Sequence, residues 1–430
     1  MSKQPSTISL KRANPYVSQS EPAPNKTARV AQVGEALKIL NLPGTLDVHL
    51  RACDDILNEV RNQRSNLQLL STDNEALAIL ARKFRLGEEE LSVRILKIFS
   101  ILCQYHNSGE AEQLSFTPFD EPEFHIFIIR LMQRKKNDIV VVDNCFDCLI
   151  YFYTAPESQF LKYVTETNQG EIAEIIVDFF KANYARTREK CALVLINLTA
   201  RCTLNTRERI HLSAGSTLIQ FARFTCLKDS LNAPFAEGIC SIIHNLCYDD
   251  LHLTDAFLKL DALNAIKSIL RTFEMESEVV FSALSVIADL ARRLDSSTIS
   301  PDLVEIIRRA MKKYLKYTHI VTAGCRALMV LTSSPTGKQI FVQLEETFDD
   351  GDIVIESLYH GKSYWKLVDL CLTILDNSLS LKSDRYRSKI KSTVGLKATL
   401  QDAIAKHHQQ NLSIYYRGRK ILQLIYGIEE

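Results

Sequence analysis

Residues 239–246 read ICSIIHNL, and this eight-residue pattern occurs four more times in the second half of the chain. The other copies are CALVLINL (191–198), ALSVIADL (283–290), GCRALMVL (324–331) and CLTILDNS (371–378). Their seventh positions are Asn197, Asn245, Asp289, Val330 and Asn377, at spacings of 48, 44, 41 and 47 residues. A period of about 45 residues with helical patterning predicts an α-solenoid, in which stacked repeats bury one another's apolar faces.

The second, fifth and eighth positions of the pattern are apolar in nearly every copy. They are Ala192, Leu195 and Leu198 in the copy at 191–198, and Cys240, Ile243 and Leu246 in the copy at 239–246. Because residues three apart lie on one stripe of a helix, these positions form the packed face. The seventh position lies beside that stripe, where a side chain can face a ligand.

The composition is that of an ordinary folded protein, with 46% hydrophobic and 24% charged residues. Only 14 of the 430 residues are glycine, which favours helices joined by short polar turns. A net charge of +1 gives no overall attraction to nucleic acid or membrane. No apolar run has the length of a signal peptide or a membrane span, so we expect no membrane span and a cytoplasmic or nuclear protein with reduced cysteines.

The distribution of residue types suggests how the chain is organised. Residues 1–30 are rich in proline and polar residues and are expected to form a disordered arm. Residues 31–430 are expected to form one solenoid. Within it we expect capping helices at 31–90, repeats at 91–380 and a basic C-terminal cap at 381–430.

A second pattern precedes the eight-residue one. FLKLDALNAIKSIL (257–270) and HLSAGSTLIQFARF (211–224) each fit a short helix, a corner at Ala262 or Ala214-Gly215, and a second apolar helix. This order resembles armadillo repeats, in which a short helix, a corner and a middle helix lead into a third helix that lines a groove. The resemblance implies an all-α, right-handed superhelical α-solenoid of about 6–8 armadillo-like repeats. The related two-helix HEAT repeat remains an alternative for the first repeats.

The resemblance also implies where a partner would bind. Armadillo proteins carry an asparagine on the third helix that bonds the backbone of an extended peptide, since an amide both donates and accepts hydrogen bonds. The expected partner-binding residues are Asn197, Arg201, His244, Asn245, Asp289 and Asn377, with a short binding segment around 190–250. The alternative is that these asparagines bond carbonyl groups of their own fold.

One departure from the armadillo nuclear-import adaptors is informative. Those adaptors pair the asparagine with a tryptophan four residues earlier. The corresponding residues here are Leu193, Ser241, Ser285, Arg326 and Thr373. A receptor for nuclear-import signals of that kind is therefore not expected.

No motif in the sequence indicates catalysis. Cys145 and Cys148 form an isolated CxxC inside an apolar, helix-like segment, which favours buried structural thiols over a zinc site. The sequence contains no HExxH, GxSxG, GxxxxGK[ST] or GxGxxG. We therefore expect no catalytic residue, no metal and no cofactor, although an enzyme on a helical-repeat scaffold remains a minor alternative.

Two clusters of positive charge remain to be explained. Residues 381–420 hold ten Lys or Arg and two Asp, and the basic residues include Arg385, Arg387, Lys389, Lys391, Arg417, Arg419 and Lys420. This block fits either a charged terminal cap or a surface for nucleic acid or an anionic membrane. A second cluster, Arg308, Arg309, Lys312, Lys313 and Lys316, has helical spacing and is expected to be a solvated outer face.

The sequence therefore predicts a non-enzymatic adaptor or scaffold that binds a protein partner, as a peptide or a helix, along a concave groove. Binding of nucleic acid or an anionic surface by the block at 381–420 is the alternative.

Overall fold

The computed structural model describes residues 26–86, 88–107, 122–154, 169–182, 187–348 and 350–427. Helices are the main regular element in these ranges, which contain no strand, so the predicted all-α fold is confirmed. Residues 1–25 of the predicted disordered arm lie outside the described residues. Residues 26–30 already belong to the first helix, so the helical region begins about one turn earlier than predicted.

The chain divides into two compact units, residues 1–210 and 211–430, which are described separately. The helices of the first unit are α1 (Lys26–Asn41), α2 (Leu46–Asn62), α3 (Arg64–Thr72), α4 (Asn74–Arg85), α5 (Glu89–Asn107), α6 (Pro122–Arg134), α7 (Ile139–Thr154), α9 (Gln169–Lys181) and α10 (Arg188–Arg201). The boundary between the units falls within α11 (Leu204–Phe224).

In the first unit, α2, α5, α7 and α10 pack against one another in that order. Each of α4, α6 and α9 packs against the helix that follows it. An aromatic cluster joins these layers, since the ring of Phe84 lies 5.9 Å from that of Phe99 and 5.0 Å from that of Phe124. Cys145 and Cys148 are buried in α7, as expected of structural thiols.

The helices of the second unit repeat one order. They are α12 (Ala233–Cys247), α13 (Leu251–Lys259), α14 (Ala262–Thr272), α15 (Ser277–Ala291), α16 (Pro301–Lys313), α17 (Thr318–Ser333), α18 (Pro335–Thr347), α19 (Ile353–Gly361), α20 (Trp365–Leu379), α21 (Asp384–Ser392), α22 (Leu396–His407) and α23 (Leu412–Tyr426). A short 3₁₀ turn at Lys228–Ser230 precedes α12. The helices that contain the eight-residue pattern, here called third helices, are α12, α15, α17 and α20 in this unit.

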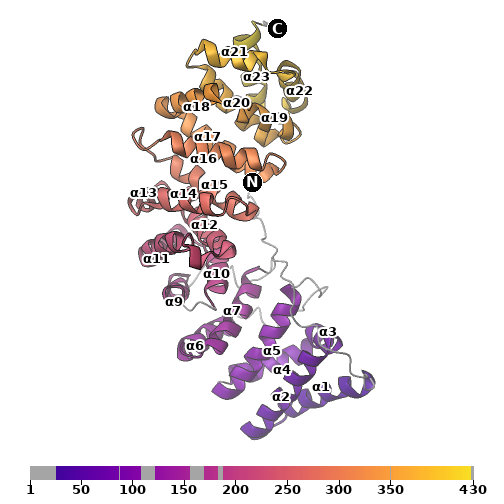
Figure 1. Cartoon of the computed structure of the whole chain (residues 1–430). Coiled ribbons are helices and arrows are strands. Elements are labelled where there is room, and N and C mark those ends of the chain that lie inside the picture. Colours follow the sequence, from indigo (N-terminus) through magenta and orange to yellow (C-terminus); the bar gives the residue numbers. More distant parts are fainter. Residues whose placement is uncertain are drawn as a thin grey trace. The chain divides into compact units, whose positions relative to one another are not determined.

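The third helices form one continuous row, in which α12, α15, α17, α20 and α23 each pack against the next (Figure 1). The apolar positions of the pattern lie inside the row, and Cys240, Ile243 and Leu246 are completely buried. The predicted packed face is therefore confirmed. The helix α23 takes the place of a further third helix, so the segment predicted as a basic cap is itself built as a three-helix repeat.

One of the two predicted corners is confirmed and the other is wrong. Between α13 and α14, Asp261 adopts a left-handed backbone with φ of 63°, which turns the chain. No such corner occurs at Ala214-Gly215, where α11 continues without a break. The buried stripe of Ala214, Leu218 and Ala222 runs through this point, and a glycine inside a helix costs only about 1 kcal/mol relative to alanine.

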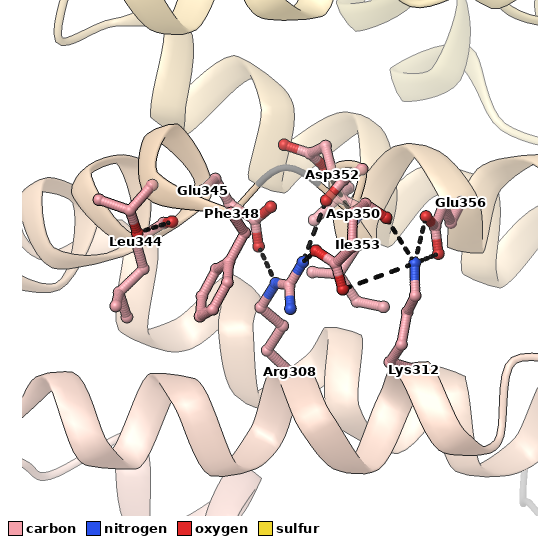
Figure 2. Close-up of polar contacts among 12 residues, drawn as sticks. Arg308, Lys312, Leu344, Glu345, Phe348, Asp350, Asp352, Ile353 and Glu356 are labelled. Carbon is pink, nitrogen blue, oxygen red and sulfur yellow. Dashed lines mark hydrogen bonds and ion pairs between the residues drawn. The ribbon is translucent and has the colours of Figure 1, made fainter.

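The outer layer of the second unit contains a buried charged cluster, which Figure 2 shows. Arg308 of α16 is 5% exposed, and its Nε donates to Glu345 Oε1 of α18 at 3.0 Å. Its guanidinium also pairs with Asp350, donates to the Gly351 carbonyl at 3.1 Å, and lies 3.9 Å from the centre of the Phe348 ring. The prediction that Arg308 faces solvent is therefore wrong.

The same cluster links the α16 repeat to the two that follow it. Lys312 of α16 donates to the Glu356 carboxylate of α19 at 2.5 and 2.6 Å. Asp352 caps the start of α19 and accepts a hydrogen bond from the Tyr386 hydroxyl of α21 at 2.9 Å. Lys389 of α21 donates to the carbonyl oxygens of Glu345 and Phe348. Charges from three repeats thus neutralise one another in the outer layer.

Candidate functional site

The candidate site is the solvent-facing side of the row of third helices in the second unit, here called the third-helix face. It is lined by half-buried polar side chains from the third, sixth and seventh positions of the pattern: Ser241, His244, Asn245, Arg326, Thr373, Asp376 and Asn377. The seventh-position residues Asn245 and Asn377 stand beside the buried apolar stripe, where the sequence placed them, and the third- and sixth-position residues flank the stripe as well. The face therefore offers hydrogen-bond donors and acceptors on a rigid helical base.

A three-residue bridge crosses the centre of this face. His244 Nδ1 of α12 lies 2.5 Å from Asp289 Oδ2 of α15, and Arg326 Nη2 of α17 lies 3.5 Å from Asp289 Oδ1. Asp289 is 0% exposed, so its carboxylate is enclosed by this bridge. The prediction that Asp289 contacts a partner is therefore wrong, because both of its oxygens already serve the scaffold.

Other bonds on the face also run from one third helix to the next. The Ser241 hydroxyl lies 3.3 Å from that of Ser282 on α15, and Asn377 Nδ2 of α20 donates to Thr332 Oγ1 of α17 at 3.3 Å. Asn377 thus has a scaffold partner while its side chain remains half-buried. These lateral bonds hold consecutive third helices in register.

Two of the predicted residues lie side by side on α12. His244 and Asn245 are half-buried and adjacent, and Tyr248 is exposed one turn further along. The rings of His244 and Tyr248 meet edge-on at 5.7 Å. An amide, an imidazole and a phenol therefore lie together near the C-terminal end of α12.

In the first unit, Asn197 bonds a carbonyl group of its own fold, which is the alternative that the sequence left open. Its Nδ2 donates to the Leu193 carbonyl of its own helix, α10, at 3.0 Å. Asn197 and Arg201 are both half-buried on α10. Because Asn197 and Asn245 belong to different units, each is treated within its own unit.

The sequence did not reveal a polar bridge among α5, α7 and α10, which are stacked in the first unit. Lys190 of α10 pairs with Asp143 and Asp147 of α7 at 2.9 and 2.6 Å. Asp147 also accepts from Gln104 and Ser100 of α5 at 2.7 and 2.9 Å. Burial raises the pKa of Asp147, although Lys190 acts in the opposite direction.

The signal that could have revealed such bridges is the third position of the pattern. Arg326 holds this position in α17, and Asp147 holds the equivalent place in the segment CFDCLIYF (145–152) of α7. Each bonds the adjacent helix of its row. In α23 the corresponding residue is Lys420, whose Nζ lies 2.6 Å from Asp376 Oδ1 of α20. A charged residue at the third position is thus a bridge between repeats in these three helices.

The predicted basic block is partly neutralised within the fold. Arg417 Nη1 donates to Asp369 Oδ1 of α20 at 2.8 Å, and Arg385 donates to the Glu346 carbonyl at 3.2 Å. Lys420 pairs with Asp376, and Lys389 donates to the carbonyl oxygens of Glu345 and Phe348. Arg387 is half-buried, whereas Lys391 and Arg419 are exposed. The Arg419 guanidinium lies over the Tyr415 ring at 4.6 Å.

The described residues contain no group of three or more His, Cys, Asp or Glu side chains placed to hold a metal ion. Within the same ranges, no helix combines the length and the apolar character that crossing a membrane requires.

The stacked third helices, each preceded by a short helix and a corner or by a middle helix, define an armadillo-like repeat fold. A chain from a study of a phosphorylation switch in the interaction between cadherin and beta-catenin shares this fold, with a TM-score of 0.50 and 13% identity over 94% of this chain and 92% of that one.

Other solved structures match with lower scores. A designed armadillo repeat protein aligns with a TM-score of 0.36 and 11% identity over 71% of this chain and 99% of its own. An engineered protein aligns with a TM-score of 0.39 and 13% identity over 60% of this chain and 99% of its own. No protein-family model matches the sequence, and no curated protein does.

Proposed function

We propose that this protein is a non-enzymatic scaffold that binds a protein partner on the third-helix face of its second unit. The observation that supports it best is the set of lateral bonds among α12, α15, α17 and α20. These bonds hold the face as one surface, while His244, Asn245 and Arg326 remain half-buried at its centre. A rigid base with partly solvated polar groups suits recognition, because little ordering is required on binding.

The bound segment would be an extended peptide. Each residue of an extended chain presents one backbone donor and one acceptor, and an asparagine amide can answer both. Asn245 is the seventh-position residue placed best for this, since it is half-buried beside His244 and near exposed Tyr248, whereas Asp289 is enclosed. The fold likeness to a chain from the cadherin and beta-catenin study agrees with a role in binding proteins.

A matched pair of variants tests the proposal. Peptides selected from a random display library against the full chain would be measured by fluorescence anisotropy with the N245A/R326Q variant. The control is N264A/R309Q, which changes the same residue types on α14 and α16, where Asn264 and Arg309 are exposed. We expect affinity to fall about tenfold or more in the first variant only, although its thermal midpoint should also fall because R326Q removes a partner of buried Asp289. N245A alone leaves that bridge intact and should show the loss of affinity as well. Equal affinity in both variants would exclude the third-helix face as the site.

We also propose that the protein acts in the cytoplasm or the nucleus. The eleven cysteines carry free thiols, and ten of them are buried, which suits a reducing compartment. Imaging of a fluorescent fusion of the full chain tests this, and secretion of the fusion would contradict it.

A further inference from the structure

A second surface of the second unit has a repeating apolar character. One large apolar side chain is exposed at the start of each third helix, with exposed fractions from 39% to 71%. These residues are Leu231, Met275, Tyr317, Tyr364 and Leu412, here called the turn edge. They recur at spacings of 44, 42, 47 and 48 residues, which is the period of the repeats. Single exposed apolar residues are common, but one within two residues of the start of each of five consecutive helices of the row is not random scatter.

Contacts between consecutive turns join the turn edge at two of its four steps. The Tyr314 hydroxyl donates to the Glu274 carbonyl at 3.1 Å, which joins the turns before α15 and α17. Lys313 Nζ also lies 2.5 Å from Met275 Sδ. Further along, His407 Nε2 lies 2.8 Å from the Lys362 carbonyl oxygen, which joins the turns before α20 and α23.

Two members of the turn edge occupy helix N-cap positions, where other residue types would stabilise the helix better. Tyr317 and Tyr364 occupy the N-cap positions of α17 and α20, and neither makes a side-chain capping bond. Serine, threonine, aspartate and asparagine stabilise this position, and Asn232 and Asn411 cap α12 and α23 in that way. At these two positions the chain therefore has a large exposed ring and no capping hydrogen bond.

We propose that the turn edge docks an amphipathic helix of a partner protein, on a surface separate from the third-helix face. Packed helices lie about 8–10 Å apart, so apolar side chains recur along the edge at about that distance. A partner helix advances about 10.5 Å in seven residues, and its phase drifts by only about 20° per heptad. An extended strand presents side chains on one face about every 6.7 Å, which does not match the edge.

Charges beside the turn edge specify the partner further. Exposed Lys316 and Lys362 lie one and two residues before Tyr317 and Tyr364. Exposed Glu274 and Glu276 flank Met275 instead, and Lys313 pairs with Glu274 at 3.5 Å, so Glu276 is the acid left to meet the partner. The partner helix is therefore expected to carry acidic residues beside the apolar positions that meet α17 and α20, and basic residues at the end that meets α15.

A synthetic peptide tests this proposal. The probe is a helical peptide of about 21 residues with leucine at every seventh position, basic residues around the first leucine and acidic residues around the others. Its binding to the full chain would be measured by fluorescence anisotropy. A second peptide of the same composition and helicity, with the leucines five residues apart, controls for general stickiness.

The variant Y317S/Y364S removes two anchors and restores favoured N-cap residues, so it should fold at least as well as the natural chain. The control variant L381S/V394S removes two exposed apolar side chains that lie outside the edge. We expect Y317S/Y364S to weaken binding about tenfold or more and L381S/V394S to leave it unchanged.

Three outcomes would overturn the proposal. The first is failure of the heptad peptide to bind the full chain. The second is equal binding by Y317S/Y364S, or equal binding of the control peptide. The third is a dimer in sedimentation that Y317S/Y364S converts to a monomer without any peptide binding, because the edge would then hold a second copy of the chain.

Discussion

Arg308 and Glu345 form an ion pair that is almost completely withdrawn from solvent. Arg308 Nε donates to Glu345 Oε1 at 3.0 Å, and the pair joins α16 to α18 of the next repeat. The side chains of Arg308 and Glu345 are 7% and 1% exposed. Breaking a buried pair by removing one partner is costly, since the remaining charge has no compensation.

The first prediction concerns this pair. Replacing Arg308 by alanine should destabilise the second unit by about 3 kcal/mol above pH 8, where Glu345 is ionised and would stay buried without its cation. Urea unfolding of the full chain, followed by circular dichroism, measures the change. Replacing exposed Arg309 on the same helix is the control and should have little effect. Equal loss in both variants would show that the buried pair contributes nothing specific.

The second prediction concerns pH. Burial, together with the nearby Asp352 carboxyl, raises the pKa of Glu345 from 4.5 to about 8, while Arg308 and Lys389 oppose the shift. The other charged or titratable groups of the cluster are Asp350, Lys312, Glu356 and Tyr386.

The direction of the effect follows from proton binding. In the unfolded chain Glu345 loses its proton near pH 4.5, whereas the folded chain holds it up to about pH 8. The contribution of this group to stability is therefore complete below pH 4.5 and is lost as pH rises through 8. The E345Q variant cannot lose a proton, so its stability should depend less on pH between 5 and about 9. A pH profile unchanged by E345Q would contradict the prediction.

The third prediction concerns the bridge on the third-helix face. Replacing Asp289 by asparagine places an amide donor against His244 or Arg326, both of which donate to the carboxylate. We expect a loss of stability of about 1–3 kcal/mol, since a buried bond is replaced by an unmatched one. Thermal unfolding measures it, with D249N as the control, because the Asp249 side chain is 72% exposed. If D289N were as stable as D249N, the bridge would not hold the repeats together.

The sequence was sufficient to predict the helices and the repeats. The apolar positions of the pattern, such as Cys240 and Ile243, report burial directly, and their spacing fixes the period. The corner predicted at Ala262 lies one residue earlier, at Asp261, because a polar residue at a chain reversal tolerates the left-handed backbone.

The errors arose where contacts cross from one repeat to another. Arg308 lies on a helix with a run of cations, a pattern typical of a solvated face, but its partners are 37 and 42 residues further along the chain. Asp289 likewise resembled a ligand-facing residue, and the two residues that enclose it lie 45 positions before it and 37 after it. Spacing within one helix carries no information on such pairs, and the turn edge escaped prediction for the same reason.

The last prediction separates the two interpretations of the basic block. Arg417 and Lys420 pair with Asp369 and Asp376, so the R417A/K420A variant should loosen α23 and lower stability by up to about 1 kcal/mol. Lys391 and Arg419 are exposed, so K391A/R419A should leave stability unchanged. Because Arg417 and Lys420 are neutralised by carboxylates of the preceding repeat, we expect little salt-dependent binding of a labelled single-stranded RNA by the full chain. Fluorescence anisotropy at two salt concentrations measures this. Tight, salt-sensitive binding that K391A/R419A abolishes would instead establish the block as an anion-binding surface, since that variant removes charge without disturbing the pairs that hold α23.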